Sequence, residues 1–446
     1  MREIFYIEDT PADKISYYFL LVFVTTLPFD RIYSELALIG LLLHTLVHLR
    51  KEDMHWSFRW MGWSGVVLYL LTMAGTLYAA KPAHAFPEWE KRLALLLFPL
   101  IAWFSRLDWQ QYRPRLLKAF AFTCLFTALY LYGVALYAIY SHHLPLGVLF
   151  TKPYMNHAFT APIDLHATYF SAYLSLSVVV FAYAVSQRQG GSVIRLGYIL
   201  AILVCLITML QLASRSVCIS MVVIGNVLIP LGWARGKMRR RLSVGIFLLT
   251  LLALWVVVRN NHMHSRYLLQ LKQDLRSDTG AVEDPEPRMA RWQCAWELIR
   301  ASPWVGYGTG SEVDRLKERY YAHGLTISYT YGLNVHNQFL SFWLKTGVVG
   351  LLLYMTVLIL GFREGVRRRD IHLTAFLVII VCISLSENIL DVNKGIFFFS
   401  MFLVIFLPKP VGGGIFTYGN KNTGASMGIR VTGHYDVLPQ GKRSRL

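Results

Sequence analysis

Long apolar runs dominate the chain and restrict its fold more than any other feature. Runs of about 18 or more residues with few charges are long enough to cross the hydrocarbon core of a bilayer. The sequence contains about twelve such runs, of which the fourth and the last are short: 15–29, 34–49, 61–79, 93–105, 116–140, 166–186, 194–213, 215–233, 242–258, 336–361, 371–387 and 394–408. Because backbone polar groups inside a bilayer must pair within their own segment, each run is predicted to be a helix.

The charged residues are few but strongly biased toward one side of the predicted membrane. Only 16% of the residues are charged, against about 25% in average soluble proteins, yet the net charge is +18. A basic chain can bind nucleic acid, but here the basic residues collect in alternate loops: Arg50, Lys51, Arg59, Arg106, Arg113, Arg115, Lys118, Arg188, Arg195, Arg235, Lys237, Arg239, Arg240, Arg241, Arg363, Arg367, Arg368 and Arg369. This bias predicts that both termini are cytoplasmic and argues against a nucleic-acid partner.

The order of apolar and polar segments divides the chain into four parts. They are nine spans, one large outward-facing loop, three more spans, and a Gly-rich basic tail predicted to be cytoplasmic and disordered, at 1–258, 259–335, 336–408 and 409–446 respectively. Apolar residues at helical spacing predict a helix in the outer loop. The expected fold is therefore all-α, a polytopic membrane protein with about twelve transmembrane helices and one large helical outer loop.

Cofactor and metal signals are weak throughout the sequence. The five cysteines form no CxxC pattern, and the fourteen histidines form no HExxH pair. The glycine-rich run from Val305 to Ser311 lacks the strand–turn–helix context of a dinucleotide site, so we interpret it as a tight turn. We therefore predict neither a metal nor another cofactor.

A polar start to one apolar run marks the first candidate site. The stretch YGLNVHNQFLSFWLKTGVVG places His336 and Asn337 where a helix begins. A histidine at a membrane edge can simply bond to lipid headgroups, but Asn337 adds polarity that an anchor does not need. Lys345 lies nine residues further on, roughly 13 Å along a helix, where a charge is costly unless it faces a polar interior. A polar cavity that opens outward would explain these residues.

Two arginines near the outer membrane surface are further candidates. Arg215, in the sequence LASRS, joins two apolar runs almost without a loop. It either extends its charge to the interface at a helix end or binds phosphate through its planar fork of donors. Arg288 precedes the predicted helix of the outer loop, where it is either a solvated charge or part of a site.

Three more charged residues lie near the predicted outer ends of spans. Lys81 and Arg92 flank the third and fourth spans, on a side that is otherwise poor in basic residues. They either face solvent or attract an anionic partner. Glu387 either makes a hydrogen bond between helices or braces a basic group across the bundle.

These residues resemble motifs of the O-antigen ligase and polymerase superfamily. His336 and Asn337, followed by Gly347 and Gly350, are similar to its helix-start motif, and LASRS is similar to its Ser-Arg helix junction. PRMARWQCAWELIRASPWVGYGTGS looks like its periplasmic segment. The specific motifs lie between about 210 and 400, although the resemblance covers most of the chain. It implies a metal-independent membrane glycosyltransferase in the bacterial inner membrane, with its active site facing the periplasm.

The resemblance also implies substrates and residue roles. The donor would be O-antigen linked to undecaprenyl pyrophosphate, and the acceptor would be lipid A–core. His336 matches the essential histidine of the family, Arg215 its junction arginine and Arg288 its loop arginine. In the mechanism that we expect, His336 takes the acceptor proton, the two arginines stabilise pyrophosphate, and direct attack inverts the anomeric centre. Additional pyrophosphate-binding residues would be Lys81 and Arg92, and supporting residues would be Asn337 and Glu387.

Two alternative functions remain open at this point. An O-antigen polymerase would share the residues and the chemistry but use a different acceptor; one compact outer loop favours a lipid-held acceptor and hence the ligase. A transporter of polysaccharide or lipid-linked sugar would also have about twelve spans. Transporters usually distribute their charges along a central path, whereas the candidate residues here gather at one membrane face.

Overall fold

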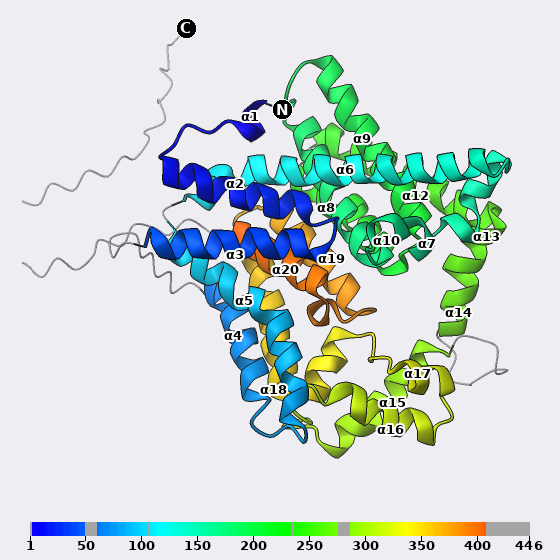
Figure 1. Cartoon of the computed structure of the whole chain (residues 1–446). Helices are drawn as coiled ribbons and strands as arrows, with labels where there is room; N and C mark the ends of the chain where they lie inside the picture. The colour runs from blue at the N-terminus through cyan, green and yellow to red at the C-terminus, as the bar shows by residue number, and fades with distance from the viewer. Residues whose placement is uncertain (1, 50–59, 106, 234–235, 275–285, 407–446) are drawn as a thin grey trace, which may run out of the picture. The chain divides into compact units, whose positions relative to one another are not determined.

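The computed structural model describes residues 2–49, 60–105, 107–233, 236–274 and 286–406, all within one compact unit. These described residues form helices and turns without a β-strand (Figure 1). The predicted all-α fold is confirmed for them. The tail that we predict to be disordered, 409–446, lies outside the described residues.

Helices follow one another along almost the entire described chain. Short 3₁₀ and π-helical turns join several of them. The α-helices are α1 (Arg2–Phe5), α2 (Pro11–Thr26), α3 (Arg31–Val47), α4 (Trp60–Ala74), α5 (Phe86–Phe104), α6 (Trp109–Ser141), α7 (His157–Thr160), α8 (Ala167–Ser186), α9 (Ser192–Leu212), α10 (Arg215–Val223), α11 (Ile229–Trp233), α12 (Gly236–Arg259), α13 (Asn261–His264), α14 (Gln270–Asp274), α15 (Arg288–Ala301), α16 (Glu312–Ala322), α17 (Thr326–Tyr331), α18 (Gln338–Arg367), α19 (Ile371–Ser384) and α20 (Asn393–Ile405).

Six helical segments in the described residues are long and apolar enough to cross a membrane. They are α6, α8, α9, the continuous segment Arg215–Gly232, Arg239–Arg259 and α18. Shorter apolar helices occupy Gly62–Ala74, Ile371–Ser384 and Asn393–Ile405. These lengths support a multi-pass membrane protein, while the count of twelve spans stays a prediction.

Central helices of the bundle are apolar on every face. Nearly all side chains of α8 and α20 are buried, as expected for helices surrounded by other helices. Helix α8 packs against α6, α9 and α19, and α20 packs against α5. Aromatic rings interlock edge to face at the centre, with centroid separations of 4.8 to 5.7 Å among Phe120, Tyr173, Phe376, Phe398 and Phe402.

Helices α18 and α19 pack together as an antiparallel hairpin. Asn337 caps the start of α18, because its Oδ1 accepts hydrogen bonds from the backbone amides of Phe339 and Leu340 in the first turn of that helix. Asp370 caps the start of α19 in the same way. His336 and Glu387 therefore lie at one end of the hairpin, and the basic turn 367–369 lies at the other.

The outer helices α15, α16 and α17 pack against one another beside the first half of α18 (Figure 1). They enclose a small apolar core of their own, which includes Ala295, Leu298 and Leu316 and also Leu344 of α18. This core makes residues 288–331 a compact group of helices.

The glycine-rich run 305–311 is a tight turn that docks on a kink in α18. Gly347 at the kink has φ 66°, and a Cβ atom there would lie 2.0 Å from the Trp304 carbonyl oxygen. The Tyr307 amide donates to the Leu344 carbonyl at 2.9 Å. A glycine at 347 therefore allows two backbones to meet, and the run needs no dinucleotide to explain it.

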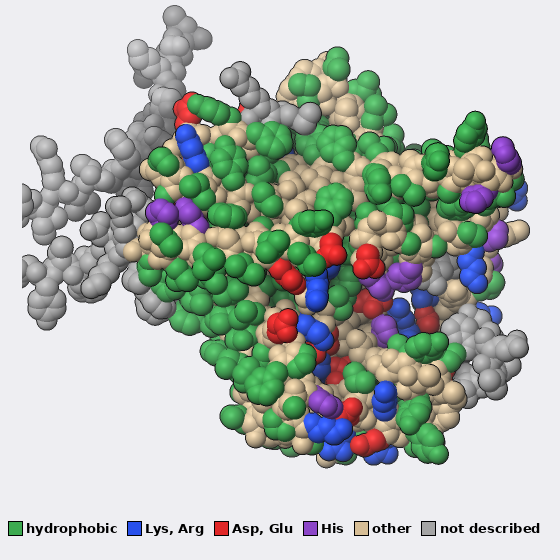
Figure 2. Space-filling view, in the orientation of Figure 1, with side chains coloured by type: hydrophobic (Ala, Val, Ile, Leu, Met, Phe, Trp, Pro, Cys, Tyr) green, Lys and Arg blue, Asp and Glu red, His purple; other side chains and the backbone are tan. Residues whose placement is uncertain are grey.

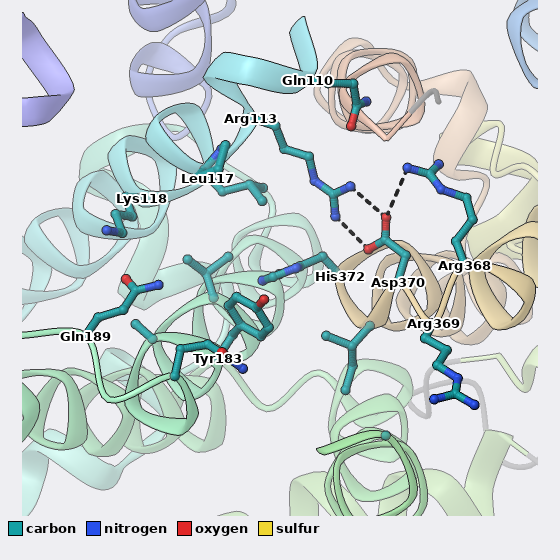
Figure 3. A pocket seen from close by; sticks show the side chains of 16 residues that line it. Gln110, Arg113, Leu117, Lys118, Tyr183, Gln189, Arg368, Arg369, Asp370 and His372 are labelled. Carbon is teal, nitrogen blue, oxygen red and sulfur yellow. Dashed lines mark hydrogen bonds and ion pairs between the residues drawn. The ribbon is translucent and has the colours of Figure 1, made fainter. Parts of the chain in front are cut away.

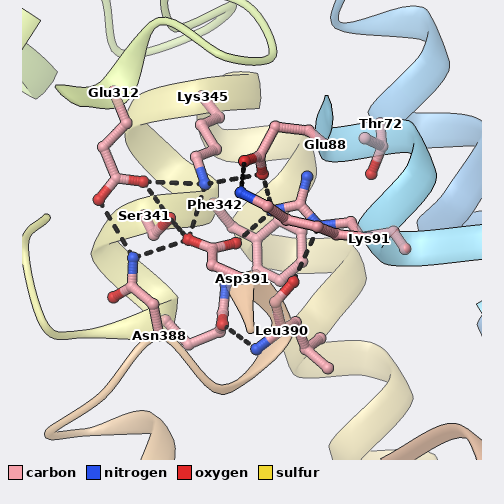
Figure 4. A network of polar contacts seen from close by, with 12 residues as sticks. Thr72, Glu88, Lys91, Glu312, Ser341, Phe342, Lys345, Asn388, Leu390 and Asp391 are labelled. Carbon is pink, nitrogen blue, oxygen red and sulfur yellow. Dashed lines mark hydrogen bonds and ion pairs between the residues drawn. The ribbon is translucent and has the colours of Figure 1, made fainter. Parts of the chain in front are cut away.

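A buried network of five charged side chains joins the outer helices to the bundle (Figure 4). Lys345 Nζ lies 2.8 Å from Asp391 Oδ2 and 2.9 Å from Glu312 Oε2. Arg92 pairs with Asp391 and, at 3.1 Å, with Glu88. None of the five side chains is more than 15% exposed. Charges this deeply buried are tolerated only when they are paired.

The same network holds the turn that follows α19. Asn388 Nδ2 donates to Glu312 Oε1 at 3.1 Å and to Asp391 Oδ2 at 2.8 Å. Asn388 Oδ1 accepts from the backbone amide of Asn337 at 2.8 Å. The turn 386–391 is thus bonded to the start of α18 and to the outer helix α16.

Removing the central carboxylate should destabilise the fold strongly. In Asp391→Asn, Lys345 and Arg92 lose their shared buried partner, at an expected cost of about 3–5 kcal/mol. Asp314→Asn is the matched control, because Asp314 pairs with Lys81 at the surface and such pairs contribute about 0–1 kcal/mol. Thermal unfolding of both purified variants in detergent measures the difference, and equal unfolding temperatures would contradict the role given to the network.

Candidate active site

His336 lies in the turn immediately before α18, held in an unusual backbone conformation. Its φ is 49°, in the left-handed region that residues other than glycine seldom occupy. The His336 amide donates to Asn334 Oδ1 at 3.0 Å, and its imidazole Nδ1 lies 2.9 Å from Glu387 Oε2. Such conformations persist where the surrounding structure enforces them, and they cluster at functional sites.

Glu387, in the turn after α19, contacts two basic side chains. Besides His336, Arg288 Nη2 lies 3.3 Å from Glu387 Oε1, and Arg288 Nη1 donates to the Ser386 carbonyl at 2.8 Å. Burial raises the pKa of Glu387, but the hydrogen bond and charge of His336, together with the charge of Arg288, lower it to about 2. The carboxylate is therefore ionised at neutral pH, as the interpretation of Glu387 as a brace for a basic group requires.

The ionised carboxylate determines which imidazole nitrogen carries the proton. A carboxylate can only accept hydrogen bonds, so His336 Nδ1 must be the protonated nitrogen. In a neutral imidazole, Nε2 then keeps its lone pair. His336 Nε2 makes no hydrogen bond within the described part of the chain, which leaves it available to accept a proton.

A second carboxylate, Asp274 at the end of α14, joins the two arginines. Arg215, the first residue of α10, pairs with Asp274 through Nη2. Asp274 Oδ2 also lies 3.8 Å from Arg288 Nε. Asp274 thus links Arg215 to Arg288, and Glu387 links Arg288 to His336. The three residues singled out in the sequence, from segments far apart in the chain, meet in one line of contacts.

Buried donors without acceptors lie beside this line. Arg215 Nη1 and Arg291 Nε are buried and have no hydrogen-bond partner among the residues that the structure describes. Arg291 follows Arg288 by three residues on α15 and is 7% exposed. A buried unsatisfied donor costs roughly 1–3 kcal/mol, and more when it is charged. Among the described residues, Arg215 and Arg288 share the two carboxylates Asp274 and Glu387, so an anion could satisfy the unused donors.

The face of the molecule drawn in Figure 2 carries a cluster of charged side chains near the candidate site. Charged and histidine side chains gather between the outer helices α15–α17 and the rest of the bundle, where the surface is hollowed (Figure 2). The α10, α15 and α18 helices begin at Arg215, Arg288 and Gln338. Helix N-termini carry partial positive charge and favour anions, which adds to the basic character of the region.

His166 also lies near the line of contacts. It precedes α8, where its Nδ1 accepts from the Thr168 amide at 3.3 Å, and its ring lies 4.2 Å from that of His157. Burial lowers the pKa of His166 to about 4. Its imidazole is therefore neutral near pH 7 and acts as a helix cap.

The other predicted site residues have different partners. Arg92 belongs to the buried network of Asp391 and Glu88, and Lys81 pairs with Asp314 at 2.9 Å on the surface. In the described residues, neither forms an ion pair with the carboxylates of the Arg215–His336 line. Their part in pyrophosphate binding stays a prediction. Asn337 caps α18, so its side chain is used by the helix rather than by the imidazole.

Sequence reasoning missed Asp274 and Asn388, because nothing local distinguishes them. Asp274 is one acid in a polar stretch, and Asn388 follows Glu387 without a recognisable motif. The only signal was indirect: clustered arginines near a membrane require counter-charges from somewhere in the chain. No three histidine, cysteine or acidic side chains in the described residues are placed to hold a metal ion together.

The comparison with known proteins concerns the same part of the chain. Residues 196–355 match a family model described as O-Antigen ligase. No curated protein matches the chain. The matched segment begins in α9, ends in α18 and includes Arg215, Arg288 and His336. Members of this family are glycosyltransferase-like enzymes, and the match supports placing the chain in the O-antigen ligase and polymerase superfamily.

Proposed function

We propose that the chain is an O-antigen ligase, which transfers glycan from undecaprenyl pyrophosphate to lipid A–core without a metal. The observation that carries this proposal is the line of contacts from Arg215 through Asp274, Arg288 and Glu387 to His336. It joins an anion-binding pair of arginines to a general base within the segment that matches the family.

The arginines bind the pyrophosphate of the donor in this proposal. Each guanidinium offers a planar fork of donors that matches phosphate oxygens. The unused Nη1 of Arg215 supports this role, since it is buried and no described residue supplies an acceptor for it. Asp274 holds both side chains in place before the donor binds, so that little reorganisation is needed as charge develops. Such preorganised charges are often the largest contribution to catalysis.

His336 deprotonates the acceptor sugar through Nε2. The hydroxyl oxygen of the acceptor attacks the anomeric carbon of the donor, and the bond from that carbon to the pyrophosphate oxygen breaks. The bonding electron pair leaves with the pyrophosphate, and the hydroxyl proton passes to His336. One direct displacement inverts the anomeric centre. Glu387 stabilises the imidazolium that results, as an acid behind a catalytic histidine does in other enzymes.

The ends of the α18–α19 hairpin support a periplasmic site in the inner membrane. The candidate residues lie at one end, and the basic turn 367–369 lies at the other. The positive-inside rule assigns the basic end to the cytoplasm. The candidate residues then lie at the periplasmic surface of the membrane. Donor and acceptor are both anchored in lipid, so both can reach a site at that surface.

Reconstitution tests the proposal directly. The purified protein is incorporated into vesicles with undecaprenyl pyrophosphate–linked O-antigen and rough lipopolysaccharide, and we expect glycan on lipid A–core. Longer glycan that stays on undecaprenyl pyrophosphate would identify a polymerase instead. Movement of the donor across the bilayer with no new glycosidic bond would identify a transporter.

Loss of the imidazole should abolish most of the transfer. We expect His336→Ala to lower the rate by about 10²–10⁴-fold, the usual contribution of a general base, without unfolding the protein. His323→Ala is the matched control, since His323 also pairs with a glutamate, Glu297, at 2.9 Å but is exposed. A folded His336→Ala protein with normal transfer would refute the role of His336.

Replacing either guanidinium with an ammonium should also impair transfer. Arg215→Lys and Arg288→Lys keep the charge but lose the fork, and removal of one such stabilising group typically costs about 10²–10³-fold in rate. Arg300→Lys, at the far end of α15 over the Trp296 ring, is expected to keep full activity. Rates measured at saturating donor decide the matter, and full activity in both test variants would exclude pyrophosphate binding by this pair.

Neutralising Glu387 should impair His336 without removing it. In Glu387→Gln the amide keeps the size of the side chain but cannot stabilise an imidazolium or fix its tautomer, so we expect a loss of roughly 10²-fold or more in rate. Glu297→Gln, which alters the exposed His323 pair, serves as the control. Transfer at the normal rate by Glu387→Gln would mean that His336 does not depend on this carboxylate.

A further inference from the structure

Successive peptide groups in the turn before α18 are each hydrogen-bonded to a side chain. The backbone amide of Val335 donates to Glu312 Oε1 at 3.1 Å, and the Val335 carbonyl accepts from Trp292 Nε1 at 3.0 Å. The amide of His336 donates to Asn334 Oδ1 at 3.0 Å. The backbone that carries His336 is therefore held by side chains rather than by regular secondary structure.

The peptide groups on both sides of the His336 Cα atom are fixed by these bonds. In the peptide group before His336, the carbonyl is held by Trp292 and the amide by Asn334. In the peptide group after it, the amide donates to Asn388 Oδ1 at 2.8 Å. Because each peptide group is planar, fixing both planes fixes the φ and ψ angles of His336, and with them the direction of its Cβ atom.

The direction of the Cβ atom decides where the imidazole can act. The φ of His336 is 49°, and a residue other than glycine keeps such a conformation only where its surroundings enforce it. The contact of Nδ1 with Glu387 Oε2 at 2.9 Å then fixes the rotation of the ring. Together the two constraints place Nε2, the atom that takes the acceptor proton in the proposed transfer.

Two of the groups that hold this turn belong to the outer helices. Trp292 lies on α15, four residues after Arg288, so the two side chains are neighbours on one face of that helix. The indole is half-buried and packs against the apolar core of the outer helices. One helix thus supplies both a proposed pyrophosphate-binding arginine and a bond to the backbone of the proposed general base.

Glu312, the first residue of α16, connects the same turn to the buried charge network. It is 2% exposed, and its carboxylate also binds Lys345 Nζ at 2.9 Å and Asn388 Nδ2 at 3.1 Å (Figure 4). Asn388 in turn holds the amide that follows His336. The outer helices and the turn after α19 therefore hold the backbone of His336 together.

The far end of the α18–α19 hairpin is anchored separately. Arg113 of α6 and Asp370 lie together at a cavity between α6, α8 and the turn that joins α18 to α19 (Figure 3). Both Arg113 Nη atoms lie 2.6 Å from the Asp370 carboxylate oxygens, and Asp370 caps α19. Loss of one bond at the His336 turn should therefore move the turn rather than the whole hairpin.

We propose that Trp292 is a positioning residue for His336: its indole N–H holds the Val335 carbonyl and so keeps the imidazole Nε2 where it can take the acceptor proton. Glu312 and Asn388 hold the neighbouring amides in the same way. This role rests on the function proposed above, because Trp292 would act only through the general base of the same transfer and would touch neither substrate.

Two tryptophan variants test the role by steady-state kinetics. Trp292→Phe keeps an aromatic ring in the outer core but removes the N–H. Trp343→Phe is the matched control, because Trp343 packs against the same core and its Nε1 donates to the Pro303 carbonyl at the same distance of 3.0 Å. We expect Trp292→Phe to lower kcat by about 10-fold, since a displacement of about 1 Å can cost up to about 10²-fold. KM for both substrates should change little.

The control should keep a kcat close to that of the wild type. Equal kcat values in Trp292→Phe and Trp343→Phe, with an active wild type, would overturn the role of Trp292 and leave the proposed function intact. Absence of transfer by the wild type would refute the proposed function itself.

A double variant separates positioning from general stability. If Trp292 acts through the imidazole, adding Trp292→Phe to His336→Ala should cause no further loss of kcat, because no imidazole remains to be displaced. A further loss of about 10-fold in that background would show that Trp292 supports transfer by another route, and would overturn its role as a positioning residue for His336.

Amide hydrogen exchange tests the hold on the turn without relying on activity. In the full-length protein in detergent, peptides that cover residues 333–338 should exchange faster in Trp292→Phe than in the wild type, because a released turn exposes its amides more often. The same peptides should exchange at the wild-type rate in Trp343→Phe. Unchanged exchange in Trp292→Phe would show that the indole does not hold the turn, whatever the outcome of the kinetic measurements.

Discussion

Two buried carboxylates in one short turn, Glu387 and Asp391, organise both the fold and the candidate site. Glu387 attracts His336 and Arg288, while Asp391 attracts Lys345 and Arg92. Buried charge is costly unless it is paired, so each carboxylate draws its partners from helices far apart in the sequence. The start of α15, the turn before α18, α18 itself and α5 are thereby held around a single turn.

This arrangement separates two kinds of basic residue that look alike in the sequence. The guanidinium of Arg92 pairs with Asp391 and Glu88, donates to the Leu390 carbonyl and thereby serves the fold. Arg215 and Arg291 instead retain buried donors for which the described part of the chain supplies no acceptor. A structural cation is satisfied by the chain itself, whereas a cation that awaits an anionic substrate keeps part of its bonding capacity unused. This difference supports the proposed role of Arg215 in binding an anionic substrate.

The helical class could be predicted from the sequence, because the length of an apolar run is a short-range signal. Local motifs also brought out Arg215, Arg288 and His336, which the structure joins in one line of contacts and whose roles stay predictions. The ion pairs that these residues form with distant carboxylates could not be predicted from such signals. Asp274 meets Arg215 across 59 positions and Glu387 meets His336 across 51, and no local pattern records such contacts. Helix ends were also difficult: the run predicted at 371–387 stops as a helix at Ser384, where the turn carrying Glu387 begins. Lys345 was expected to need a polar interior, but its acidic partners, Glu312 and Asp391, were not foreseen.

The position of that turn in the chain has a consequence for biogenesis. Among the described residues, every basic partner of Glu387 and Asp391 precedes them in the sequence, so the ribosome makes these basic groups before it makes the two carboxylates. Neither cluster of ion pairs can form until the turn between α19 and α20, which carries both carboxylates, has been synthesised. A nascent or truncated chain that lacks this turn would thus lack both clusters, and the line of contacts from Arg215 to His336 would stay incomplete.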